Sequence, residues 1–414
     1  MVVALKLKNK ALKSIAILLT CFYITAFVTS FYYSLRAMVV STTASDDNNK
    51  TINGHYNINI LSYSQQDSLR LLSTGVSTST GVTTEENSIS GQDLLDWGVD
   101  DIDAERVWGG FEDATDARTS YTGYGITVAV IDTGINYNHP DLDDNYIGGL
   151  NYYDDYYHPT QNLPADHNGH GTHCAGIIAA EDNNMGVIGV APDASLYAVK
   201  ITEDGESISP TYLIQAINDI ARKVYNREVD VDIISISLGT PSLPETYLEC
   251  LQDVINNAYN KGIIVVAAAG NGGSDSVDYP ARLEHVIAVG AINEDHQRAA
   301  FSNYGAELDL VAPGVNINST YSDENLSPLY KTLDGTSMAA PMVAGVCALI
   351  LSANRDLTPD NVTEILKITA NDLGEPGRDN VYGWGEVNAS RALDAARLCD
   401  CHGFNFGTFA FVET

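Results

Sequence analysis

Residues 334–345 read Asp-Gly-Thr-Ser-Met-Ala-Ala-Pro-Met-Val-Ala-Gly, a pattern typical of a tight turn that opens into a helix. Gly335 supplies a permissive backbone before the helix, and Ser337 stands at its start. The small residues that follow predict a thin helix that can pass through a crowded core. At a helix start, free N–H groups and the helix dipole favour negative charge, which a hydroxyl creates when it attacks a carbonyl. Ser337 is therefore a candidate nucleophile, although a lone serine in this position is usually only a helix cap.

Two further motifs favour the nucleophile over the cap. Asp132 follows the apolar run 126–131, which predicts a strand buried on both faces of a parallel sheet. The carboxyl end of such a strand is where open α/β sheets place functional groups. His170 lies in residues 167–176, His-Asn-Gly-His-Gly-Thr-His-Cys-Ala-Gly. Aspartate, histidine and serine in this chain order form one of the known hydrolytic triads.

These three motifs together resemble the subtilisin-like serine proteases, the subtilase family, over about residues 93–398. The resemblance implies that Ser337 attacks the scissile carbonyl, His170 transfers the proton and Asp132 orients the imidazole. Residues 267–272, Ala-Ala-Ala-Gly-Asn-Gly, match a fourth motif of the family. Its asparagine, Asn271 here, would donate its side-chain N–H to the oxyanion beside the backbone N–H of the serine.

The resemblance also implies how substrate is held. A peptide would add as a β-strand to exposed backbone, with pockets supplying specificity. The residues implied for this role are Ser237, Leu238, Gly239 and Gly272. Residues 204–209 resemble the opposite wall of the substrate-binding cleft. Asp278 is placed by its motif near the bottom of the first substrate pocket, where a carboxylate would favour Arg or Lys before the cut. The alternative is a solvated loop carboxylate.

Calcium is the cofactor that the resemblance implies, because residues 139–142 and 181–187 match the two halves of the family's tight site. Hard oxygen ligands suit this ion. The implied ligands are the side chains of Asp141 and Asn183, the carbonyls of Glu181, Met185 and Val187, and Asp93 from the N-terminal side. The alternative is an ordinary asparagine-rich loop. A weaker cation site near Glu307 and Asp309 is conceivable.

Apolar runs alternate along the chain between strand-like and helix-like periodicity, which predicts an α/β fold. We expect a subtilisin-like three-layer architecture with a mostly parallel, doubly wound central sheet flanked by helices. Further strands are predicted at 196–199, 231–236, 263–268 and 286–289. Helices are predicted at 213–224, around 254–258, at 358–369 and at 388–398.

The chain carries 22 basic and 54 acidic residues, a net charge of −32, which argues against nucleic acid or anionic membrane surfaces as partners. The charge is compatible with cation binding, a salty medium or simply solubility. Of six cysteines, Cys174 and Cys347 are expected to be buried thiols. One disulfide, from Cys250 to Cys399 or Cys401, is conceivable.

Lysines before the apolar run 14–33 predict export, through a cleaved signal peptide or an uncleaved signal anchor within residues 1–44. Residues 45–92 are a polar prosegment or stalk, 93–398 the peptidase domain and 399–414 a tail. We expect a secreted or surface-tethered, monomeric, calcium-stabilised serine endopeptidase acting on polypeptides, with its own prosegment as a partner. A narrow processing protease, an inactive binding protein of the same fold and a cell-surface structural protein are the alternatives.

Overall fold

The computed structural model describes residues 93–109, 121–153, 163–203, 209–322 and 329–399. Its centre is a seven-stranded sheet in which every neighbouring pair is parallel, in the order β2-β3-β1-β4-β5-β6-β7. The strands are β1 (Thr127–Asp132), β2 (Tyr146–Asn151), β3 (Ser195–Lys200), β4 (Ile233–Ile236), β5 (Ile264–Ala268), β6 (Val286–Ile292) and β7 (Leu310–Pro313). Strands β8 (Ile317–Thr320) and β9 (Tyr330–Leu333) form a separate antiparallel pair.

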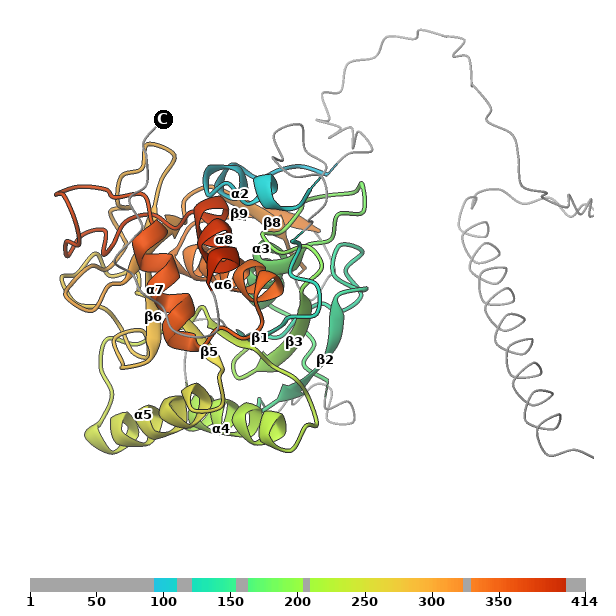
Figure 1. Ribbon diagram of the computed structural model, residues 1–414. Helices are drawn as coiled ribbons and strands as arrows, with labels where there is room; N and C mark the ends of the chain where they lie inside the picture. The colour runs from blue at the N-terminus through green and yellow to red at the C-terminus, as the bar shows by residue number, and fades with distance from the viewer. Residues whose placement is uncertain (1–92, 110–120, 154–162, 204–208, 323–328, 400–414) are drawn as a thin grey trace, which may run out of the picture. The chain divides into compact units, whose positions relative to one another are not determined.

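Helices cover both faces of the sheet, as Figure 1 shows. One face is covered by α4 (Pro210–Tyr225) and α5 (Glu245–Tyr259), and their apolar sides pack with the sheet into one core. The other carries α3 (His170–Ala179), α6 (Thr336–Ala353), α7 (Pro359–Thr369) and α8 (Ala389–Leu398), around a second core. The short helices α2 (Trp97–Asp101) and η1 (Glu105–Val107) precede β1. The predicted three-layer α/β fold is therefore confirmed.

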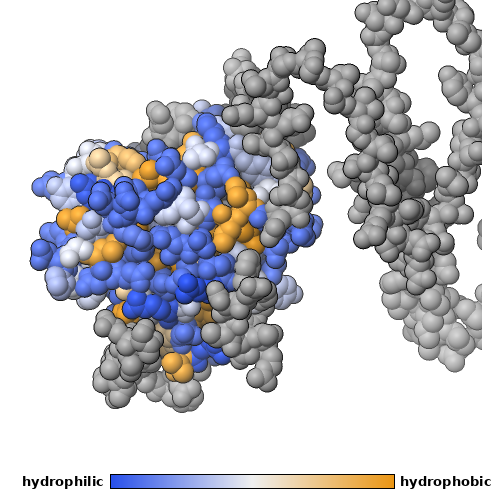
Figure 2. All heavy atoms as spheres, turned by 90° about the horizontal axis from the view of Figure 1, so that it is seen from above, coloured by the Kyte–Doolittle hydropathy of each residue, from blue (hydrophilic) through white to orange (hydrophobic). Residues whose placement is uncertain are grey.

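Helix α6 passes through the second core, against the sheet and against α3 and α8. Among the described residues it is the one helix long and apolar enough to cross a membrane, yet most of it is buried inside the fold. Its alanines and glycine allow close approach, since a methyl group added at Gly345 would lie 2.6 Å from Val190. The helix is thus a core element of the fold. In Figure 2 the surface seen from above is mostly hydrophilic, with small separate hydrophobic areas.

The sheet order reverses beside β1. From β1 the chain goes to β2 at one edge of the sheet, comes back to β3 beside β1, and then crosses to β4 on the other side of β1. The crevice at such a reversal, outside the carboxyl ends of the strands, is where open α/β sheets bind ligands. Asp132 ends β1, Ser237 directly follows β4, and Asn271 comes three residues after β5. The topology therefore brings three segments with candidate residues to one edge.

Several predictions of structure differ from what is observed. The sequence pattern missed β2 and β7, whose short runs carry glycines or a proline, and the pair β8–β9. The conceivable pairing of Cys250 with Cys399 is wrong, because both are free thiols. Cys250 is exposed, whereas Cys399 is buried and its thiol donates to the Ala395 carbonyl at 3.0 Å. The predicted export segment, residues 45–92, Cys401 and the tail beyond 399 lie outside the described residues.

Candidate active site

Asp132 and His170 are in direct contact. The fully buried carboxylate of Asp132 places Oδ1 2.7 Å from His170 Nδ1, and the Thr133 N–H donates to the same oxygen at 2.7 Å. Gly171 makes this approach possible, because a methyl group there would lie 2.2 Å from the Gly134 carbonyl oxygen. Burial alone would lower the pKa of His170, but the charge of Asp132 and its hydrogen bond outweigh burial and raise that pKa. The imidazole is held ready to carry positive charge.

The start of α3, which carries His170, is fixed by a residue that the sequence analysis missed. The helix cap, Gly169, has no side chain to bond the first N–H groups. Asp166 does so instead: its carboxylate accepts from the N–H groups of Gly169 and Thr172 at 2.9 Å and from the Thr172 hydroxyl at 2.6 Å. An aspartate shortly before a helix start is a recognisable capping signal, so Asp166 could have been found from the sequence.

Ser337 lies in the first turn of α6, as predicted, and is partly exposed. Its hydroxyl donates to the Ser237 carbonyl at 2.9 Å. The hydrogen bonds described for this hydroxyl do not include one to His170. The serine side chain must therefore rotate before the imidazole can take its proton, and catalytic hydrogen bonds often tighten in this way only when substrate binds.

Two nitrogen atoms border one small volume beside Ser337. A methyl group added at Gly335 would lie 3.5 Å from both Asn271 Nδ2 and the Ser337 backbone nitrogen. The amide of Asn271 is oriented by Thr336, which donates to its oxygen from both the backbone N–H and the hydroxyl, each at 2.9 Å. This leaves the NH₂ group on the other side. Thr336 is a second supporting residue that the sequence analysis missed.

These groups line a cavity of about 550 Å³. Its lining contains Ser337 and Asn271 together with all five implied substrate residues, namely Ser237, Leu238, Gly239, Gly272 and Asp278. Asp278 Oδ1 accepts from the Asn303 side chain at 3.2 Å, and burial raises the pKa of Asp278. Asn303 also accepts from the Gly272 N–H at 3.0 Å, so it joins two walls of the cavity. Asn303 belongs to no motif that the sequence analysis recognised.

Comparison with known proteins shows the family of this chain. Residues 123–385 match the model of the subtilase family, peptidase family S8. The chain belongs to the subtilase family of serine-type endopeptidases. Subtilisin BL from Lederbergia lenta is 44% identical over 273 residues, 66% of this chain and 91% of that protein. M-protease from Shouchella clausii is 44% identical over 271 residues, and subtilisin DY from Bacillus licheniformis is 41% identical over 276. The match spans 65% of the length of M-protease, less than two thirds.

The six implied calcium ligands of this subtilase meet around one loop. Asn183 Nδ2 donates to Asp141 Oδ1 at 3.1 Å, and the Val187 N–H donates to Asp141 Oδ2 at 3.0 Å. The Glu181 N–H bonds the Asp141 carbonyl at 3.0 Å. Asp93 closes the loop from the N-terminal side, since its carboxylate accepts the N–H groups of Asn184 and Met185.

The donors at this loop fit a hard cation. Asn183 Oδ1 is buried and accepts no hydrogen bond within the described part of the chain. Burial raises the pKa of Asp141 to about 6, which reflects the cost of a carboxylate without a counter-charge. Gly186 has φ +74°, and a methyl group there would collide with the Tyr330 hydroxyl and the Asp141 carboxylate. An unpaired amide oxygen, a carboxylate and a loop with no room for a side chain suit Ca²⁺.

The conceivable weaker site near Glu307 and Asp309 looks different. Lys367 Nζ lies 3.1 Å from Asp309 Oδ1, and an Arg282 nitrogen lies 3.5 Å from Glu307 Oε1. Both carboxylates border a cavity of about 340 Å³. Because side-chain cations already lie beside both acids, the need for a metal ion there is weak.

Proposed function

We propose that this subtilase is an exported endopeptidase that hydrolyses peptide bonds in polypeptides through an acyl-enzyme on Ser337. The observation that carries the proposal is the 2.7 Å contact between buried Asp132 and His170, and a cavity that Ser337 and Asn271 line together supports it. An inactive relative of the same fold would have no need for an imidazole oriented by a buried carboxylate.

Each residue has one chemical role in the proposed reaction. Ser337 Oγ forms a bond to the substrate carbonyl carbon while its proton passes to His170 Nε2. The negative charge on the carbonyl oxygen is stabilised by Asn271 Nδ2 and the Ser337 N–H. The amide bond then breaks, and the leaving amine takes the proton from His170. Water repeats the sequence and releases the acid, while Asp132 keeps the imidazole in the required tautomer.

Substrate binding would also release the serine. The Ser237 carbonyl now accepts the Ser337 hydroxyl at 2.9 Å. A peptide that adds as a strand along residues 237–239 offers its own backbone N–H to that carbonyl. The Ser337 hydroxyl then loses its partner and can turn to His170. The Ser337 hydroxyl thus becomes available to His170 only when the substrate backbone is bound.

Asp278 supports a preference for Arg or Lys before the cleaved bond. Its carboxylate lies in the cavity that contains Ser337, and the nearby Arg282 is directed to Glu307 and to the Ser276 hydroxyl at 3.2 Å. A half-buried carboxylate attracts a substrate cation more strongly than an exposed one, because solvent screens it less.

We further propose that calcium binds the loop formed by residues 181–187 with Asp141. The Asp141 carboxylate, Asn183 Oδ1 and backbone carbonyls of Glu181, Met185 and Val187 would hold it, with Asp93 closing the loop. When bound, the ion supplies structural stabilisation rather than chemistry, because an ion that binds only the folded state favours that state.

From the sequence pattern we also propose that the protein is exported, with a signal segment within residues 1–44 and a prosegment at 45–92. The enzyme would be a monomer that is secreted or tethered to the cell surface. Relatives named subtilisin BL and M-protease support the protease part of this proposal.

A fluorophosphonate probe tests the proposed activity, because it labels serines that a neighbouring base has made nucleophilic. The mature protein should be labelled and should digest casein, whereas a Ser337→Ala variant should do neither. A folded native protein that resists the probe would instead favour the inactive binding protein.

A further inference from the structure

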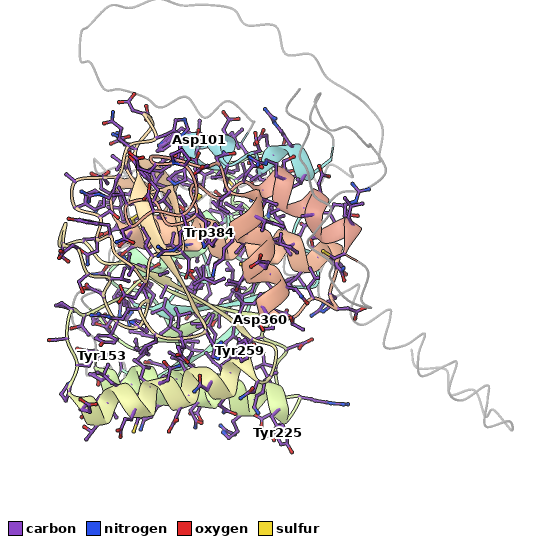
Figure 3. All side chains as sticks on the ribbon, turned by 60° about the vertical axis from the view of Figure 1, so that its left-hand side comes forward. Asp101, Tyr153, Tyr225, Tyr259, Asp360 and Trp384 are labelled. Carbon is purple, nitrogen blue, oxygen red and sulfur yellow. The ribbon has the colours of Figure 1, made fainter. Side chains whose placement is uncertain are left out.

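A second cluster of metal-binding side chains lies away from the proposed active site and away from the proposed calcium loop. It consists of Asp101, His296 and Glu386, whose ligand atoms all lie within 4.8 Å of one another. They come from three distant parts of the chain: the end of α2, the turn after β6 and the segment before α8. Figure 3 labels Asp101 at the end of its short helix.

The distances match a metal coordination sphere. His296 Nδ1 lies 3.2 Å from Glu386 Oε2 and 3.7 Å from Asp101 Oδ2. A tetrahedral ion with N and O ligands at about 2.0–2.2 Å has neighbouring ligands about 3.3–3.6 Å apart. Small side-chain shifts would therefore bring all three atoms onto one ion, with a fourth position left for water.

The backbone holds the cluster in place. Glu386 pairs with Asn371 through hydrogen bonds of 2.8 and 2.9 Å, so its side chain leaves from a fixed point beside β7. The His296 N–H donates to the Asn293 carbonyl at 2.9 Å in a tight turn where His296 has φ +55°. The site is partly pre-organised.

The carboxylates lack adequate neutralisation from the protein. The Glu386 side chain is only 2% exposed, and Asp101 Oδ2 is a buried oxygen that accepts no hydrogen bond among the described residues. The ligand oxygens of Asp101 and Glu386 lie within 4.8 Å of each other. Two acids at this separation need a shared cation or a shared proton. His296 is 45% exposed, which leaves a path for an ion from solvent.

We propose that Asp101, His296 and Glu386 bind a divalent transition-metal ion, namely Zn²⁺, which accepts imidazole nitrogen and carboxylate oxygen ligands in a four-coordinate site that a water completes. Calcium is a poor occupant, because an imidazole nitrogen is not among its usual oxygen ligands. The bound ion would join the N-terminal segment to the turn after β6 and to the chain before α8. Its role is to stabilise the folded domain, independently of the chemistry at Ser337.

Thermal unfolding of the full-length Ser337→Ala protein, which cannot digest itself, tests the proposal. Excess calcium is kept present throughout, so that zinc does not compete for the loop at 181–187. Added ZnCl₂ should raise Tm by about 5 °C at a hundredfold excess over Kd. Calorimetric titration should give one zinc ion per chain, and the anomalous signal at the zinc edge in a crystal should lie between the three side chains.

Two matched variants locate the effect. His296→Asn removes the imidazole but keeps a residue that tolerates positive φ, and Glu386→Gln removes the buried charge with the same shape. Both should abolish the zinc-dependent shift. The control is His285→Asn, at a second histidine with positive φ, +64°, outside the cluster, which should keep the full shift. An unchanged shift in His296→Asn, or no shift in the parent protein, would mean an ordinary histidine–carboxylate pair or a shared proton and would overturn the proposal.

Discussion

Ser237 and Ser337 exchange two hydrogen bonds of 2.9 Å, each hydroxyl donating to the backbone carbonyl of the other. Pro341 explains one of them. In a regular helix the N–H four residues ahead would bond the Ser337 carbonyl, but proline has no N–H. The Ser237 hydroxyl fills this vacancy, with the Cys174 thiol as a second donor at 3.4 Å. The proposed nucleophile is thus anchored to the proposed substrate-binding segment through a bond that the helix itself cannot supply.

Replacing Ser237 with Ala should therefore affect both stability and catalysis. The Ser337 carbonyl would keep only a weak thiol donor, which should lower the free energy of unfolding by about 1–3 kcal/mol. The turnover number, kcat, should fall because the first turn of α6 is less well held. Urea unfolding of inhibited protein and peptide hydrolysis measure the two effects.

The matched control is Ser235→Ala, two residues away on β4. The Ser235 hydroxyl is buried without a hydrogen-bond partner in the described structure, so its loss should change stability by less than about 0.5 kcal/mol. Equal losses in the two variants would show that the bond to Ser337 has no special role.

Thr336→Val should lower kcat with little change in KM. The variant keeps the shape of the side chain but removes the hydroxyl that donates to Asn271 at 2.9 Å, so the amide can turn away from the oxyanion. We expect a loss of about 10-fold, smaller than the roughly 10²–10³-fold loss measured in subtilisin when the oxyanion asparagine itself is removed. Thr336→Ser keeps the hydroxyl and should stay close to the native rate. A Val variant as active as the native protein would contradict this orienting role.

The pH dependence should report the raised pKa of His170. The imidazole is a base only when neutral, so kcat/KM should rise with pH through a value above the ordinary 6.5. Asp132→Asn should move this limb to lower pH and lower the rate by about 10⁴-fold, the order seen in serine proteases. Rates with a fluorogenic peptide across the pH range measure both effects.

The protonation of His170 should also affect stability, but in the opposite direction: stability should fall as the pH rises, whereas activity increases. A histidine whose folded pKa is raised stabilises the protein fully below its unfolded pKa, and this contribution is lost as pH rises through the folded pKa. Unfolding of Ser337→Ala at pH values on either side of 6.5 should show that loss, and Asp132→Asn should remove it. If the acid limb of the kcat/KM profile of the native enzyme lay below pH 6.5, it would contradict the assigned interaction between Asp132 and His170.

The sequence predicted the fold well where burial leaves a simple pattern. The run 126–131 is apolar throughout because β1 is covered on both faces, and the amphipathic spacing over 213–224 follows from α4 covering one face of the sheet. Strand β2 was not predicted because its glycines interrupt the apolar pattern. Glycine is required there, since a methyl group at Gly149 would lie 2.2 Å from the Ala198 carbonyl oxygen. Local periodicity does not contain that close approach.

Motifs pointed to the residues at the site but not to those that support them. Thr336 and Asn303 act through hydrogen bonds to residues far away in the chain, and such partners are set by tertiary packing rather than by spacing. The cluster of Asp101, His296 and Glu386 was missed for the same reason, since the three residues are far apart in the chain. Asp166 differs, because its bonds at the start of α3 are local and follow a capping pattern. Conversely, the number of cysteines alone suggested a disulfide between Cys250 and Cys399, but both are free thiols in the fold.

Asp278→Asn should weaken a preference for basic residues before the cleaved bond. The amide can still accept from Asn303, so the shape is kept while the charge is lost. The ratio of kcat/KM for Arg over Phe substrates should fall by about 10-fold, a loss near 1.4 kcal/mol. Because the pKa of Asp278 is raised, the native ratio should also fall as the pH is lowered.

The control is Asp275→Asn, which makes the same change of charge at an exposed position outside the cavity lining. It should leave the Arg-to-Phe ratio unchanged. If native enzyme cleaves Phe or Leu substrates faster than Arg substrates, Asp278 is a loop carboxylate and no specificity element.

Calcium removal should lower thermal stability through the loop at 181–187. Asn183→Ala removes the buried oxygen that lacks a protein donor, so the difference in Tm between calcium and EDTA should shrink from several degrees to a fraction of that value. Asn184→Gly is the control, because Asn184 has φ +64° and glycine keeps that conformation while the neighbouring oxygen remains. Inhibited protein avoids self-digestion during the melt. If EDTA leaves Tm unchanged in the native protein, Asn183 Oδ1 is an unsatisfied acceptor of an asparagine-rich loop. A calcium effect that Asn183→Ala leaves intact would place the ion elsewhere in the chain.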